Sequence, residues 1–353
     1  MKKNFTLISL SVALMASANS PYISKVYEFV PAPGQFVNEM PEYEEGDDAD
    51  AMNAKVEEQI CGDQMPGLIS LGAWGGYVVF GFDHPVVNVP GEYDFKIYGN
   101  AFKANQASDG GSCEPGIVMV SQDTNKNGLP DDTWYELAGS EYTKSETTLK
   151  YKITYNRPDD DRAIGADPDP NNKYICDRTY IKWEDNKNEI GYVMRNVYHR
   201  QSYWPLWIED ATISFEGTKL ADNAYDQSGN GSYFVLKFYD WGYVDNQPNA
   251  NDSGFKIDWA VDAAGNSISL THIDFIKVYS AVNQYCGWIG ETSTEICGGE
   301  DLHPDAVLTS VEDIINNDNT QIEYYNLQGI KIENPSKGFF IKKQGNKITK
   351  III

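Results

Sequence analysis

The feature that most constrains the fold is a succession of short segments in which β-branched and aromatic residues recur between turn residues. At residues 93–98 apolar and polar side chains alternate, which is the period of a strand with one buried face. Similar segments lie at residues 77–82, 116–120, 133–137, 151–155, 180–183, 211–215, 233–238, 254–261 and 273–279. About ten such strands predict an all-β fold, an antiparallel β-sandwich of jelly-roll type.

A helix is expected only at residues 48–58, where acidic residues are enriched early in the segment. Long polar loops at residues 104–112, 159–172 and 245–251 connect the predicted strands. Because rigid sheets present functional side chains on their connections, we expect recognition to take place on these loops. No fixed-period repeat is found, which disfavours a propeller or a solenoid.

The N-terminus has the pattern of a secretory signal peptide. Lys2 and Lys3 precede an apolar run at residues 5–16, and small residues follow at 16–18. The run is too short to span a bilayer, which needs about 20 apolar residues, and no other segment approaches that length. We therefore expect export from the cytoplasm without a membrane span, with a mature chain that starts near Asn19.

Residues 321–353 form a basic tail on an acidic protein, and alternating segments at 322–330, 339–341 and 347–353 predict a small β unit there. The pattern YYNLQGIKIENPSKGFFIKKQGNKITKIII resembles the C-terminal sorting tails of exported Bacteroidetes proteins, which the type IX secretion route or a relative of it reads. The alternative is a plain terminal hairpin domain. The expected organisation is a signal peptide at 1–18, the β-sandwich at 19–304, a linker at 305–320 and the tail at 321–353.

Charge excludes two classes of partner. Lys and Arg number 28 against 52 Asp and Glu, a net charge of −24. A polyanion such as nucleic acid, or an anionic lipid surface, needs clustered Lys and Arg on its partner. The same acidity suits a protein that holds hard cations.

The cysteines number five, an odd number for an exported chain, and their pairing is not readable from sequence. Cys286 and Cys297 flank a glycine-rich turn and make the best local pair. No Cys/His spacing suggests zinc. We expect one or two disulfides and a free thiol among Cys61, Cys113, Cys176, Cys286 and Cys297.

The sharpest motif is DTNKNGLPDD at residues 123–132. Oxygen-bearing side chains at alternate positions, followed by Gly128, curl inward around a cation. The run resembles the calcium loops of EF-hands and dockerins over nine positions, but Trp134 stands at position twelve in place of their glutamate. We expect a structural Ca²⁺ here; the alternative is a solvated turn. The predicted ligands are Asp123, Asn125, Asn127, the carbonyl of Leu129, and Asp131 or Asp132.

Two aromatic clusters, at residues 198–207 and 239–243, suggest a platform for a ligand. Ring faces stack on sugars or macrocycles, and amide side chains supply directional hydrogen bonds. For any one ring the alternative is a place in the core, because a sandwich of this size needs large side chains. The predicted ligand-binding residues are Tyr198, Gln201, Tyr203, Trp204, Trp207, Trp241, Tyr243 and Asn246.

Catalytic motifs are scarce. The sequence has no GxSxG, HExxH or P-loop pattern. A pair of carboxylates for glycoside hydrolysis is not identifiable among 52 acidic residues, since their separation in space decides the chemistry. A binding protein is therefore favoured over an enzyme.

Five segments together resemble a family of secreted or lipid-anchored Bacteroidetes cell-surface proteins that are often labelled PKD-like. They are VYEFVPAPGQFVNE, SLGAWGGYVVFGFDHPV, YGNAF, CEPGIVMVSQDTNKNGLPDDTWYELAGSEY and FKIDWAVDAAGNSISLTHIDFIKVYSAVNQYCGWIGETSTEI, at residues 26–39, 70–86, 98–102, 113–142 and 255–296. The resemblance implies a role in an outer-surface uptake system, and some members resemble surface binders of cobalamin. This chain departs from anchored members because it lacks a lipobox cysteine and carries the C-terminal tail.

Three hypotheses follow. The first is a secreted or surface-displayed protein that captures a small nutrient, in particular a corrinoid (vitamin B12), beside an outer-membrane uptake complex. The second is a carbohydrate-binding or adhesion module that uses the same rings on glycans. The third is a glycoside hydrolase or lyase with carboxylate chemistry.

Overall fold

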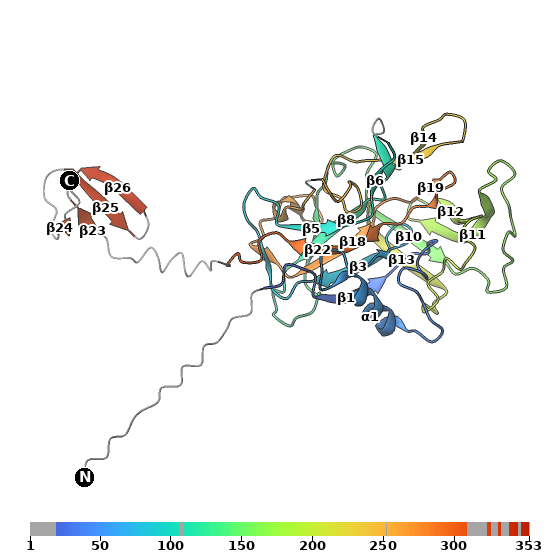
Figure 1. Cartoon of the computed structure of the whole chain (residues 1–353), viewed down its shortest axis with the longest axis horizontal. Coiled ribbons are helices and arrows are strands. Elements are labelled where there is room, and N and C mark those ends of the chain that lie inside the picture. Colours follow the sequence, from blue (N-terminus) through green and yellow to red (C-terminus); the bar gives the residue numbers. More distant parts are fainter. Residues whose placement is uncertain are drawn as a thin grey trace, which may run out of the picture. The chain divides into compact units, whose positions relative to one another are not determined.

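A computed structural model describes residues 19–105, 109–251, 253–308, 323–325, 331–332, 339–344 and 347–352 (Figure 1). The predicted signal peptide and residues 309–320 of the predicted linker lie outside the described residues. The chain divides into two compact units between Ala306 and Val307, and each is described by itself. None of the helices formed by the described residues has the length and apolarity needed to cross a lipid bilayer.

The larger unit is built around a six-stranded sheet whose neighbouring strands are all antiparallel. Along its strand β8, Val118 and Val120 face one apolar core, while Ile117 and Met119 face another. Successive side chains of a strand point to opposite faces of the sheet. Because both sets of side chains are apolar and buried here, the sheet is covered on both faces. In spatial order the strands are β1 (Lys25–Val30), β3 (Tyr77–Gly81), β18 (Phe275–Ser280), β8 (Gly116–Ser121), β9 (Trp134–Leu137) and β16 (Ala260–Val261).

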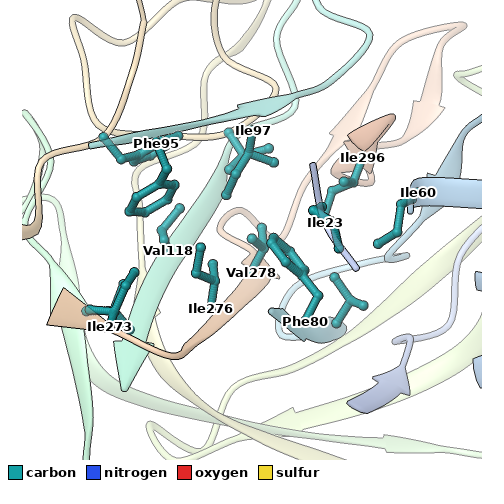
Figure 2. Close-up of a cluster of buried hydrophobic side chains, with 14 of the residues drawn as sticks. Ile23, Ile60, Phe80, Phe95, Ile97, Val118, Ile273, Ile276, Val278 and Ile296 are labelled. Atoms are coloured by element: carbon teal, nitrogen blue, oxygen red, sulfur yellow. The ribbon is translucent and has the colours of Figure 1, made fainter. Parts of the chain in front are cut away.

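The first face is covered by helix α1 (Ala49–Ile60) and by strand β5 (Phe95–Tyr98), which pairs with β22 (Gly298–Asp301). Figure 2 shows this core, in which side chains from the helix and both sheets meet. The expected helix at 48–58 is confirmed. Asp48 caps it, because its carboxylate accepts a hydrogen bond of 2.9 Å from the Ala51 N–H.

The second face is covered by a four-stranded antiparallel sheet. Tyr151 and Tyr155 of this sheet pack against the buried Trp74; the Trp74 and Tyr151 rings meet edge to face with centroids 4.8 Å apart. The prediction of an all-β, sandwich-like fold is thereby confirmed. The strands, in order, are β12 (Ile190–Asn196), β11 (Ile175–Asp185), β10 (Thr148–Asn156) and β13 (Thr212–Lys219).

A third, smaller sheet extends from the main body (Figure 1). Gly110 and Gly111 stand where strands approach closely, since a Cβ at either position would lie 2.3 Å or less from a carbonyl oxygen of the neighbouring strand. The strands are β14 (Ala224–Asp226), β15 (Phe234–Lys237), β7 (Gly110–Ser112) and β6 (Phe102–Lys103). Short pairs complete the unit: β2 (Ile69–Ser70) with β21 (Glu295–Ile296), β4 (Val86–Val87) with β17 (His272–Ile273), and β19 (Tyr285–Cys286) with β20 (Gly290–Glu291).

One expected strand is largely absent. Residues 254–261 form a single bridge at Phe255, then the 3₁₀ turn η1 (Ile257–Trp259) and only the two residues of β16. The buried Asp94 carboxylate accepts a hydrogen bond of 2.7 Å from the Ile257 N–H. That bond replaces a strand partner, so the segment turns while Phe255 and Ile257 stay buried.

The five cysteines, all within the described residues, are free. The predicted Cys286–Cys297 disulfide is therefore wrong. Cys286 belongs to the β19–β20 pair and packs against Cys113 and Leu236. Cys297 lies between β21 and β22, and its thiol is 3.4 Å from the carbonyl oxygen of Gly99, which follows β5. The glycine-rich turn after Cys286 joins β19 to β20, and the chain then continues through β21 before it reaches Cys297.

The smaller unit is a four-stranded antiparallel sheet in the order β24-β23-β25-β26. The small C-terminal β unit is thus confirmed, while its sorting role stays a prediction. Of the expected strand at 322–330 the structure describes residues 323–325, which are in a strand; residues 322 and 326–330 lie outside the described part. The strands are β23 (Glu323–Tyr325), β24 (Lys331–Ile332), β25 (Phe339–Gln344) and β26 (Lys347–Ile352).

Candidate functional site

A cavity of about 660 Å³ opens between the third sheet and three loops of the larger unit, and we call it the aromatic pocket. Its rim carries rings that are well exposed: the side chains of Phe102, Tyr198, Tyr233 and Trp288 are 60, 67, 38 and 40 % exposed. The lining residues are Gln35, Phe36, Phe102, Ala104, Gly111, Ser112, Glu114, Tyr198, His199, Tyr233, Phe234, Val235, Trp288 and Ile289.

The polar groups of the pocket are few. Among the described residues that line it, Glu114 is the only carboxylate, and none is a lysine or arginine. Ser112 donates a hydrogen bond of 3.1 Å from its hydroxyl to Glu114 Oε2. Burial lowers the pKa of His199, so its imidazole is neutral at neutral pH.

Glu114 belongs to a buried group of three carboxyls, the carboxyl cluster, whose other members are Asp245 and Glu295. One oxygen from each lies within 4.8 Å of the others. Asp245 is held in place by the Asn100 N–H, which donates to Oδ1 at 2.8 Å, and by the Glu295 N–H, which donates to Oδ2 at 3.1 Å. The cluster therefore lies against the pocket with Glu114 as the member that reaches it.

The cluster is costly to ionise. Burial raises the pKa of Glu114 to about 7 and, together with the neighbouring carboxyls, holds the pKa of Asp245 and Glu295 well above the ordinary carboxyl value. Burial also raises the pKa of Glu291 to about 8. At neutral pH Asp245, Glu291 and Glu295 therefore retain their protons, and Glu114 retains its proton in part of the molecules, unless a positive charge comes close to them.

Gln35 connects the pocket wall to the buried acids. Its N–H donates to Glu291 Oε2 at 2.9 Å, and its side-chain amide donates to the Ile289 carbonyl at 3.2 Å. The amide oxygen of Gln35 and Oε1 of Glu291 are buried and have no hydrogen-bond partner. Unmet acceptors of this kind favour a ligand or a proton that supplies a donor.

The eight predicted ligand-binding residues do not form one surface. Tyr198 lines the aromatic pocket, and the Gln201 amide donates to the Gln35 carbonyl beside it. Trp207 stacks between Phe29 and Tyr43, with ring centroids 6.0 and 6.2 Å away, at the edge of a different cavity.

Four of the predicted residues are buried, which corrects their assignment to a ligand surface. Tyr203 and Trp204 are 0 and 2 % exposed. The Trp204 indole donates to the Ile208 carbonyl at 2.9 Å, and the Tyr203 hydroxyl donates to the His199 carbonyl at 3.0 Å. Both rings fill the core between the two large sheets, where they stabilise the loop that carries Tyr198.

Tyr243 and Asn246 are buried as well. The Tyr243 hydroxyl accepts from the Glu141 N–H at 3.0 Å, and the Asn246 amide pairs with both backbone groups of Tyr239. Trp241, which is 42 % exposed, packs on Trp259 at 4.6 Å and lines a separate cavity of about 270 Å³.

Sequence reasoning missed most residues of the pocket, including Phe102, Glu114, Tyr233 and Trp288. A usable signal does exist for two of them. Trp288 stands in the run CGWIG and Tyr233 follows GNGS, so each ring adjoins a glycine-rich turn. A large ring on such a turn is poorly placed to fill a core.

The predicted calcium loop is closed by hydrogen bonds that its own backbone and amide N–H groups donate to its carboxylates. The Asp123 carboxylate accepts from the Asn127 N–H at 3.0 Å and from the Gly128 N–H at 2.8 Å, and Gly128 has a positive φ of 73°. Asp131 accepts from the side-chain amides of Asn125 and Asn127 at 3.0 and 2.9 Å. Asp132 accepts hydrogen bonds from Thr124, so both acids that could complete a shell are tied into the loop. Calcium binding itself stays a prediction.

If the loop holds Ca²⁺, adding the ion is expected to raise the melting temperature by on the order of 5 °C over that in EDTA, because a ligand that binds only the folded state stabilises it. Asp123→Ala is expected to abolish the difference. Asp262→Ala, which removes an acid from another exposed turn, is expected to preserve it. Identical melts with Ca²⁺ and with EDTA would show that the loop is a solvated turn.

No protein-family model and no curated protein matches this chain, so the geometry of the aromatic pocket and of the carboxyl cluster beside it is what bears on function.

Proposed function

We propose that the protein is a non-catalytic binding protein, exported to the cell surface or beyond it, that captures a small molecule in the aromatic pocket. The observation that carries the proposal is the ring of exposed aromatic side chains around a cavity of about 660 Å³. Ligand pockets have volumes of about 300–1,000 Å³ and combine apolar walls with a few polar groups. Exposed apolar rings gathered at one place favour a partner that covers them.

The pocket supports capture better than turnover. Glycosidases place two carboxyl groups on opposite sides of the scissile bond. Among the described residues of this pocket wall, only Glu114 offers a carboxyl group, since Asp245 and Glu295 lie behind it. Glu114 can position a ligand, but a single carboxyl group does not flank a glycosidic bond on both sides as hydrolysis requires.

The first ligand to test is a corrinoid, because the sequence resemblance points to cobalamin binders and a macrocycle offers a broad face to the rim rings. A glycan offers smaller apolar faces to the same rings. Calorimetric titration with cyanocobalamin and a glycan array separate these two ligands. An outer-membrane uptake complex as a partner, and the sorting role of the tail, remain proposals that depend on export.

Trp288→Ala is expected to weaken the binding of whichever ligand is found by about tenfold or more, because a large exposed ring at a binding site carries much of its affinity. Trp241→Ala is the comparison, since Trp241 is equally exposed but lines another cavity. Calorimetry measures the affinity of both variants for the ligand and so shows which of the two cavities binds it. A loss of binding in Trp241→Ala alone would move the site to the second cavity and contradict the proposal.

A further inference from the structure

We infer that the aromatic pocket selects an organic cation, a ligand that carries an ammonium group on an apolar body, with the positive charge placed beside Glu114. The inference rests on the proposed function, since it names the class of ligand for the same pocket. Two features carry it: the carboxyl cluster against the pocket wall and the exposed aromatic rings that line the pocket.

Every ionisable group that faces Glu114 is an acid, which is neutral while it holds its proton and negative once it loses it. The groups that face it are the carboxyls of Asp245, Glu291 and Glu295 and the thiols of Cys113 and Cys286. No described residue that lines the pocket is a lysine or arginine. An anionic ligand would meet these acids with nothing to pair with, whereas a cation would supply the missing counter-charge.

The rim rings suit the rest of such a ligand. Tyr198, Tyr233 and Trp288 line the pocket, and their side chains are well exposed. The face of an aromatic ring carries partial negative charge, and quaternary ammonium groups are held by several such faces together. The apolar body of the ligand would contact Phe36 and Phe234, which also line the pocket.

Binding a cation here is an exchange for a proton. Because burial raises the pKa of Glu114 to about 7, part of the molecules carry a proton on Glu114 at neutral pH. An ammonium group that arrives beside it favours the ionised carboxylate, so the proton leaves to solvent. The Ser112 hydroxyl already donates to Glu114 Oε2 and would stabilise the ionised form.

The test uses phenyltrimethylammonium and tert-butylbenzene, which have the same shape and differ by one positive charge. The cation is expected to bind the full chain at least tenfold more tightly at about pH 7, with an affinity that rises between about pH 6 and 8. Calorimetry in two buffers of different ionisation enthalpy should show that protons are released on binding at about pH 7 and that the release fades toward about pH 9.

Glu114→Gln is expected to remove both the preference for the cation and the proton release. Glu136→Gln is the matched control. Burial also raises the pKa of Glu136 to about 7, but its carboxylate bonds to the Thr218 hydroxyl at 2.6 Å and lines a different cavity. Tyr233→Ala should likewise weaken the cation several-fold, while Tyr192→Ala, which is equally exposed at 38 % outside the pocket, should not.

Equal affinity for the two probes, or an unchanged preference in Glu114→Gln, would overturn the inference. If tert-butylbenzene or cyanocobalamin then binds with a dependence on Trp288, the pocket is a binding site for neutral molecules and the proposed function stands without the inference. If no probe binds and Trp288→Ala changes nothing, both fail together.

Discussion

Replacing Trp204 with alanine is expected to lower the free energy of unfolding by about 3–5 kcal/mol, as is usual when a large buried ring is deleted. The side chain is 2 % exposed, and its indole N–H bonds to the Ile208 carbonyl. The substitution would therefore leave both a void and an unpaired acceptor. Denaturant unfolding followed by circular dichroism measures the loss.

Trp288→Ala is the matched control for this prediction, because it makes the same substitution at a ring that is 40 % exposed. Its expected effect on unfolding is within about 0.5 kcal/mol. The two variants thus separate a tryptophan of the core from a tryptophan of the pocket. If Trp204→Ala is as stable as the unchanged protein, Trp204 is not a core residue, and the sequence-based assignment to a ligand surface would stand.

The second large effect is a loss of stability as the pH rises from about 5 to about 8. Burial raises the pKa of Glu114 and Glu136 to about 7 and that of Glu291 to about 8. Over this range the folded state therefore binds more protons than the unfolded state, and the free energy of unfolding falls with pH. Below the pKa that a group has in the unfolded chain, it costs no stability. As the pH rises from that value to the pKa of the folded state, the free energy of unfolding falls.

The variant that tests this is Glu291→Gln, which keeps an acceptor for the Gln35 N–H and removes the ionisable group. It is expected to be more stable than the unchanged protein by on the order of 2–4 kcal/mol at about pH 8 and nearly equal at about pH 5. Glu92→Gln, at an exposed position, should leave the curve unchanged. Melting temperatures across the pH range measure both. A stability that rises toward pH 8 would contradict the prediction.

The sequence predicts the layers well because strand alternation is a local property. Residues 93–98 give β5, and residues 77–82 give β3, because β-branched and aromatic side chains favour an extended backbone wherever its partners lie. Which faces are covered is not local, since β3 is buried on both. The same reasoning fails at 254–261, where Phe255 and Ile257 are buried as expected, but a carboxylate far along the chain, that of Asp94, turns the backbone.

The site is harder to predict because the sequence does not distinguish an aromatic residue in the core from one that lines a pocket. Whether Trp204 is buried depends on partners such as Asn38, whose side-chain amide donates to the Trp204 carbonyl at 2.9 Å across 166 residues of sequence. The pocket likewise joins Gln35, Glu114 and Trp288, which share no local motif. Only the fold brings these side chains together.

The order of strands in the six-stranded sheet has a consequence for biosynthesis. β18 lies between β3 and β8, yet it is encoded about 150 residues after β8. During synthesis from the N-terminus, the edges of β3 and β8 that will pair with β18 therefore have no partner until residue 280 has been made. Such edges invite pairing with other chains, so newly made molecules depend on quick completion, or on a chaperone that shields both edges, to escape aggregation.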